Sequence, residues 1–154
     1  MNRARSLSLF VPALSLALAA CGAPGPRPVL LNEDQCAYCR MEVTDARFTA
    51  EAVTRIGRIH VFDSVECLAG YAAGAESGTV ASLWVTDAEH PGTFVKADAA
   101  GYLLDSSLRG PMGRAVAFAS PDAARAAQRT LGGKLVNWSA IMTDSSVSHA
   151  HGAP

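Results

Sequence analysis

The segment that decides the fold reads RFTAEAVTRIGRIHVFDSVE and spans residues 47–66. Residues 47–54 alternate in the manner of a β-strand, and residues 59–62 form a second β-type run. Gly57 supplies the permissive backbone of a turn between them, so the pattern predicts a β-hairpin. Asp63 then precedes residues with helical spacing, and Glu66 completes a capping box with it. We expect a helix that Asp63 caps and Gly74 ends.

A strand at residues 80–86 follows this helix, and the second half of the chain loosely repeats this order of elements. Strands are predicted there at residues 94–95, 101–104 and 114–119. Ser120 as N-cap and Pro121 at the first helical position begin a second helix that ends at Gly132. A short strand at 134–136 and a helical turn at 138–142 follow. Hairpin, helix and strand, twice, predict an α+β fold of two similar ββαβ units with small antiparallel or mixed sheets.

The N-terminal segment, residues 1–20, has the pattern of an export signal peptide. Arg3 and Arg5 provide its positive charge, and its apolar run is shorter than the roughly 20 residues that span a bilayer. Small residues then lead to Cys21, in a pattern that resembles the lipobox of bacterial lipoproteins. The resemblance implies cleavage before Cys21 and acylation of this residue, which would anchor the chain stably. In lipoproteins of enteric type, a residue such as Gly22, rather than Asp, after the cysteine implies sorting to the outer membrane, so we expect the protein to lie there and to face the periplasm.

Composition divides the remaining chain into three parts. Residues 21–28 form a proline-rich lipidated tether, and residues 144–154 form a polar tail that we expect to be disordered. Residues 29–143 are near the common size of one domain. Without Arg3 and Arg5, the 13 basic residues fall to 11 against 14 acidic ones, and no basic block remains. We therefore expect no nucleic-acid partner.

Soft potential ligands gather in the segment DQCAYCRM, residues 34–41, just before the hairpin. Cys36 and Cys39 have the spacing of a metal knuckle, and Met41 lies two residues further on. Soft sulfur donors select Cu(I), and a thioether is rare in structural zinc sites. The thioether needs no deprotonation, whereas thiolates bind tightly only after losing a proton. The segment therefore favours a Cu(I) site that captures the ion and releases it by ligand exchange.

Two other interpretations of this segment remain open. Cys36 and Cys39 also suit a structural zinc-binding scaffold or a thiol–disulfide oxidoreductase, with Met41 packed in the core. Three of the four cysteines remain when the lipidated Cys21 is set aside, an odd number for an oxidising compartment. At least one thiol is therefore unpaired, or a metal ion holds them.

Further candidate ligands lie outside this segment. Met112 stands in a Pro/Gly turn, where a core-filling methionine is unusual, so it is a candidate thioether ligand. His60 on the second strand and Glu66 on the helix are candidates for a second, harder ion such as Zn(II). Cys67, taken alone, reads as a buried small hydrophobe before it reads as a ligand. Helix capping rather than metal binding accounts for Asp63.

Taken together, these segments resemble the NosL family. The resemblance is carried by the lipobox at Cys21, DQCAYCRM at 34–41, FDSVECL at 62–68 and PMG at 111–113. It covers residues 28–142 and implies a fold of two ββαβ units. It points to Cys39, Met41 and Met112 as the best copper ligands, with Cys36 close behind. Cys67 lies in a family segment, which does not by itself make it a ligand.

The resemblance also implies a function. Members of the family are periplasm-facing lipoproteins that carry Cu(I) to nitrous-oxide reductase while its copper centres are assembled. We therefore expect a lipid-anchored metallochaperone rather than an enzyme. Its expected partners are the reductase and the reductase's assembly and transporter complex. The tail histidines, His149 and His151, add at most a weak metal-binding pair.

Overall fold

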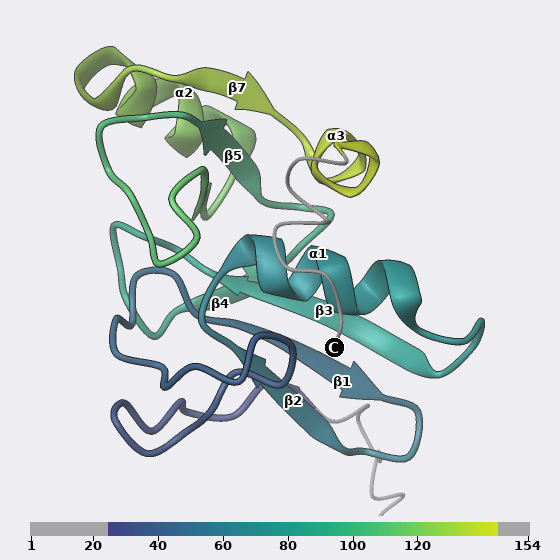
Figure 1. Cartoon of the computed structure of the whole chain (residues 1–154). Helices are drawn as coiled ribbons and strands as arrows, with labels where there is room; N and C mark the ends of the chain where they lie inside the picture. The colour runs from purple at the N-terminus through teal and green to yellow at the C-terminus, as the bar shows by residue number, and fades with distance from the viewer. Residues whose placement is uncertain (1–24, 145–154) are drawn as a thin grey trace, which may run out of the picture.

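The computed structural model describes residues 25–144 (Figure 1). The first unit contains β1 (Ala50–Thr54), β2 (Ile59–Phe62), α1 (Val65–Gly74) and β3 (Val80–Thr86), and β4 (Phe94–Lys96) follows it. The second unit contains β5 (Gly101–Leu104), β6 (Ala115–Phe118), α2 (Pro121–Leu131) and β7 (Lys134–Val136), and α3 (Trp138–Thr143) comes last. The predicted signal peptide, Cys21 and residues 145–154 lie outside the described residues. Within residues 25–144, no helix combines the length and the apolar character that a membrane span needs.

The two units have the same antiparallel topology. The first sheet has the strand order β2-β1-β3-β4, and the second has the order β6-β5-β7. In each unit the first strand of the hairpin is central, and the strand after the helix pairs with its other side. The predicted α+β fold of two similar ββαβ units is therefore confirmed. β4, which we expected in the second half, instead pairs with β3 and extends the first sheet.

The two units also begin their helices in the same way. A phenylalanine ends the second strand of each, Phe62 and Phe118, and a serine N-cap follows two residues later. The Ser64 hydroxyl accepts the N–H of Cys67 at 3.1 Å, as the Ser120 hydroxyl accepts that of Ala123 at 3.2 Å.

The prediction that Asp63 caps α1 is wrong. Ser64 has an extended backbone, with φ of −157° and ψ of 162°, that brings its own hydroxyl to the first turn of the helix. The carboxylate of Asp63 points instead toward Cys39. Asp63 is therefore available for a role other than capping.

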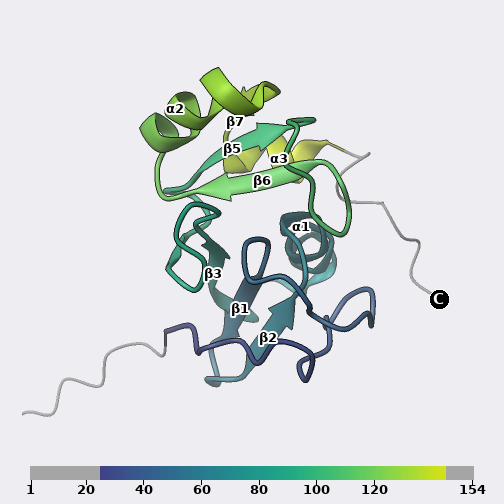
Figure 2. The same cartoon turned by 90° about the vertical axis from the view of Figure 1, so that its left-hand side faces the viewer.

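Helix α1 lies between the two sheets (Figure 2). It packs against β1 on one side and against β6 and α3 on the other, and its residues from Val65 to Gly70 are all buried. Helix α2 covers the second sheet through Ala124 and Ala127. The first turns of α1 thus lie at the junction of the two units, where burial fixes any side chain that they carry.

The chain before β1 is tied to the first sheet. The Arg27 side chain forms a two-pronged ion pair with Asp34, and the Arg27 N–H donates to the carboxylate of Glu51 on β1 at 2.9 Å. Arg27 lies within the stretch that we predicted to be tether, so packing against the domain begins before residue 29.

Candidate metal centre

The C-x-x-C-x-M segment forms a tight turn that closes on itself. The Cys36 N–H donates to the Met41 carbonyl at 2.8 Å, and the Arg40 N–H donates to the Cys36 carbonyl at 3.0 Å. A β-bridge between Gln35 and Glu42 holds the two ends of the turn together. Arg40 adopts a φ of 67°, in the left-handed region that a reversal of this kind requires. The segment just before the hairpin is therefore a closed turn.

This turn rests on two elements of the first unit. The Ala37 N–H donates to the carbonyl of Val61 at 2.8 Å, so the turn adds to the outer edge of β2. The ring of Tyr38 packs against Gly70 on α1. Because both supports are regular elements, the position of the two cysteines relative to α1 is well fixed.

Four potential ligand side chains meet where the turn faces the start of α1. Cys36, Cys39, Asp63 and Cys67, called the Cys–Asp cluster below, each offer one ligand atom, and these atoms all lie within 4.8 Å of one another. All three thiols are free. Cys39 is half-buried, and the other three residues are buried. This spacing and this donor set suit a single tetrahedral ion with three sulfur ligands and one oxygen ligand.

The carboxylate of Asp63 is incompletely satisfied. Its Oδ2 accepts a hydrogen bond from the Cys39 thiol at 3.4 Å, whereas its buried Oδ1 has no partner among the described residues. A buried carboxylate oxygen without a partner is costly. A cation shared between this oxygen and the thiols would compensate that cost, so the residues present fit a metal ion.

The three thiols differ in acidity because of their surroundings. A hydrogen bond from the Cys67 thiol, together with N–H groups of Asp63, Cys39 and Tyr38, lowers the pKa of Cys36 to about 6. The same bond to Cys36, together with burial, raises the pKa of Cys67. Burial above all raises the pKa of Cys39 to about 11. The cluster therefore concentrates its negative charge on the sulfur of Cys36. A bound cation would favour loss of the protons from the other two thiols.

The two candidate methionines differ in exposure. Met41 ends the turn and is 45% exposed. Met112 is half-buried and packs against the hydrophobic core that includes Cys36 and Cys67. One thioether is therefore exposed at the end of the turn, and the other packs against the core to which two of the thiols belong.

The two candidates for a harder ion have other surroundings. His60 stacks on Tyr71, with 5.1 Å between the ring centroids, and does not belong to the Cys–Asp cluster. Glu66 is buried, and its Oε1 accepts the N–H groups of Arg114 and Ala115. Asp63 is the candidate oxygen ligand, and the sequence had assigned it to helix capping. Its signal was the polar pair Asp63-Ser64 before a helix that needs only one N-cap.

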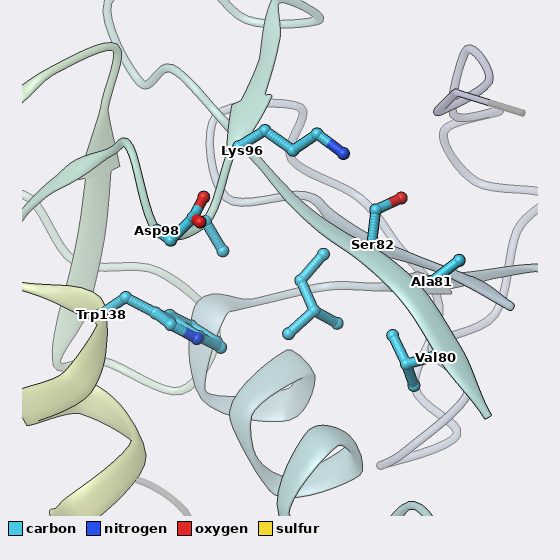
Figure 3. Close-up of a pocket in the computed structure, with 8 residues that line it drawn as sticks. Val80, Ala81, Ser82, Lys96, Asp98 and Trp138 are labelled. Carbon is cyan, nitrogen blue, oxygen red and sulfur yellow. The ribbon is translucent and has the colours of Figure 1, made fainter. Parts of the chain in front are cut away.

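A cavity of about 580 Å³ beside β3 shares no residue with this cluster. Figure 3 shows Trp138, at the start of α3, on one side of it and Val80 on another, and Lys96 and Asp98 also line it. The candidate metal centre, in contrast, lies where the turn packs against α1. The space between its ligand atoms fits an ion, whereas an organic ligand needs a larger cavity.

Comparison with a solved structure supports the fold. The crystal structure of the copper chaperone NosL from Shewanella denitrificans has a TM-score of 0.65 and 21% sequence identity, and the match covers 79% of this chain and 98% of that one. The solution structure of the apo-NosL protein from Achromobacter cycloclastes has a TM-score of 0.45 and 28% identity, covering 64% of this chain and 87% of that one. Among curated protein sequences, none matches this chain.

The family assignment rests on the sequence itself. The NosL family profile matches residues 28–146, which include the C-x-x-C-x-M turn, all of α1 and both units of the fold. This match covers most of the chain, and the segments that carry the resemblance within residues 34–113 fall inside it. The chain belongs to the NosL family.

Proposed function

We propose that this protein is a Cu(I) metallochaperone. The observation that carries the proposal is the convergence of three thiols, Cys36 and Cys39 from the turn and Cys67 from α1, within 4.8 Å of one another. Soft thiolate and thioether donors suit Cu(I), and thiolates also suit Zn(II). Membership in the NosL family and a fold shared with a protein described as a copper chaperone support the same function.

The candidate ligands include both soft sulfur atoms and a harder oxygen atom. This mixture favours two different ions rather than one. Asp63 supplies an oxygen, a ligand that suits Zn(II) and not Cu(I). We infer that a second ion such as Zn(II) occupies the buried Cys–Asp cluster. Cu(I) is bound on the more exposed side by Cys39, Met41 and Met112. Cys39 is half-buried and belongs to both sets.

This division would make copper the exchangeable ion. Met41 is 45% exposed and Cys39 is half-buried, whereas Cys36, Cys67 and Asp63 are buried. Soft ligands of a partner protein can therefore replace the outer sulfurs one at a time. The inner ion would remain in place and keep the turn attached to α1.

We further propose that the chaperone is a lipoprotein anchored through Cys21 and facing the periplasm, in the outer membrane. Its partners would be nitrous-oxide reductase and the reductase's assembly and transporter complex, which it supplies with copper. Family membership and the export-signal pattern of residues 1–20 support this part of the proposal.

The thiol geometry argues against the oxidoreductase alternative. A redox C-x-x-C pair needs an accessible thiolate with a lowered pKa. Here Cys36, whose pKa is lowered, is fully buried, and Cys39, which is more accessible, has a raised pKa. A disulfide substrate would therefore reach Cys39, the thiol with the raised pKa, before it could reach Cys36. This arrangement supports metal transfer rather than catalysis.

Anaerobic competition against a Cu(I) chelator tests the proposal. Cys39→Ser and Met41→Leu should each weaken Cu(I) binding by well over the roughly 10–100-fold that is typical of a change outside the ligand shell. Met142→Leu is the matched control, because Met142 packs against the same core from α3. Near-wild-type Cu(I) binding by both test variants would overturn the copper proposal.

Thermal melts separate the remaining alternative, a structural zinc scaffold. Metal-free, Zn(II) and Cu(I) forms of the mature protein are compared without oxygen. A chaperone should bind Cu(I) in addition to Zn(II) and release it to the chelator while staying folded. A scaffold would melt on removal of Zn(II), and copper would not restore it.

A further inference from the structure

The buried carboxylate of Glu66 joins the two units of the fold. Glu66 is the second residue of α1 and is only 3% exposed. Its Oε1 accepts the N–H of Arg114 at 3.1 Å and the N–H of Ala115 at 2.7 Å. The two donors are 48 and 49 positions away along the chain, at the start of β6.

These bonds fall at an edge strand. β6 pairs with β5 on one side only, so the N–H groups on its other side need partners from elsewhere. Glu66 supplies an acceptor for the N–H of Ala115, the first residue of β6, and for the N–H of Arg114 just before it. An apolar residue in its place would leave both N–H groups without this acceptor, so the buried carboxylate has a definite task.

The segment that Glu66 holds is the end of the Pro111-Met112-Gly113 turn. Arg114 follows this turn directly, and Gly113 has a φ of +86° that sets the direction of the chain there. The neighbour of Glu66 on α1 is Cys67, a member of the Cys–Asp cluster. One residue thus fixes the backbone beside Met112 to the helix that carries Cys67.

We propose that Glu66 is a positioning residue for copper, which acts by holding the Met112 thioether against the thiols. The inference rests on the proposed function, in which Met112 is a Cu(I) ligand. Met112 is half-buried against the core that contains Cys36 and Cys67, so a small shift of its turn changes what the thioether touches. Glu66 itself does not contact the ion.

Three variants distinguish this role from a general effect on stability. Glu66→Gln retains an oxygen at Oε1 and should accept both N–H groups, so Cu(I) binding should stay near that of wild type. Glu66→Asp is one methylene shorter and should draw the turn out of place. Cu(I) affinity should then fall about 10–100-fold, as is typical for residues that orient ligands. Glu66→Leu, which keeps the volume but has no acceptor, should behave like Glu66→Asp. Glu76→Asp, at an exposed position, is the control.

The decisive measurement is a double-mutant cycle with Met112→Leu in the mature protein, read by anaerobic chelator competition and X-ray absorption. Glu66→Asp should remove one sulfur from the Cu(I) shell, and it should have no further effect on affinity once Met112 is leucine. An unchanged sulfur shell and affinity in Glu66→Asp, or in Glu66→Leu if the first variant does not fold, would overturn the inference. If Met112→Leu alone leaves the affinity unchanged, the inference also falls, whereas Cys39→Ser still decides the copper proposal separately.

Discussion

Tyr38 and Gly70 lie in direct contact: a Cβ atom on Gly70 would come to 2.6 Å from Cζ of the Tyr38 ring. Tyr38 stands between the two cysteines of the turn, and Gly70 lies on α1 one helical turn after Cys67. Glycine therefore permits the close approach of turn and helix that brings the three thiols together.

Gly70→Ala should lower stability despite placing alanine inside a helix. Alanine normally stabilises a helix interior by about 0.5–1 kcal/mol over glycine. Here its methyl group overlaps the Tyr38 ring, and such overpacking costs about 1–3 kcal/mol. Urea denaturation measures the effect. In a Tyr38→Ala background the clash is gone, so the same substitution should become stabilising. An effect of equal sign in both backgrounds would show that the contact does not constrain the turn.

Glu51 should make stability depend on pH. Burial raises its pKa from an ordinary value of 4.5 to about 7, and its Oε1 has no partner among the described residues. Between these two values the folded protein holds the proton more tightly than the unfolded chain does. The free energy of unfolding therefore falls as pH rises through this interval and levels off above about pH 7.

Glu51→Gln should abolish this dependence. The variant should match wild type at low pH and exceed it at about pH 8 by up to about 3 kcal/mol, at 1.36 kcal/mol per pKa unit. Urea denaturation of both proteins at several pH values gives the difference between their free energies of unfolding. Ionisation of the thiols contributes equally to both proteins and cancels in this difference. Glu76→Gln, at an exposed position, is the control. A difference that is constant with pH would contradict the prediction.

The sequence predicted those parts of the fold that depend on local signals. Gly57 marks the hairpin turn, and Ser120-Pro121 marks the start of α2; both are present. The position of β4 could not be predicted in this way, since its pairing with β3 is decided by sheet packing rather than by residues 94–96. Pairing partners are long-range information that one sequence does not display.

Only the two cysteines of the turn could be predicted as parts of the candidate site from local sequence. Cys36 and Cys39 are recognisable by their spacing, but Cys67 joins them because the turn packs onto α1 through Tyr38. Asp63 was misassigned because Asp and Ser both cap helices well, and only the backbone angles of Ser64 decide between them. The link from Glu66 to β6 has no local signal at all.

Asp63→Asn should separate the two proposed ions. The substitution keeps the size of the side chain and removes its charge, which matters to Zn(II) and little to Cu(I). Zn(II) affinity should fall by about 10–100-fold or more, whereas Cu(I) affinity should change little. Separate competition titrations for each metal measure the two values. Asp98→Asn, at an exposed position, is the control. An equal loss of both affinities would contradict the division of ligands between two sites.

The two serine N-caps offer a matched pair of substitutions. Ser64 and Ser120 have the same position in the two units and the same bond to an N–H three residues on. Ser64→Ala and Ser120→Ala should each lower the free energy of unfolding by about 1 kcal/mol, because each leaves a helix N–H unsatisfied. Urea denaturation of the metal-free protein measures both.

Only Ser64→Ala should also weaken metal binding. The N–H that Ser64 accepts belongs to Cys67, so loss of the cap loosens the first turn of α1 and moves a thiol of the Cys–Asp cluster. The equivalent residue in α2, Ala123, has no side chain that could bind a metal ion. The Ser120→Ala variant should therefore bind Zn(II) as tightly as wild type does. The expected loss for Ser64→Ala is about tenfold or more, by the rule for residues that orient ligands. Equal Zn(II) affinities for the two variants would mean that capping and the position of the cluster are independent, and that packing from Tyr38 and Gly70 alone holds Cys67 in place.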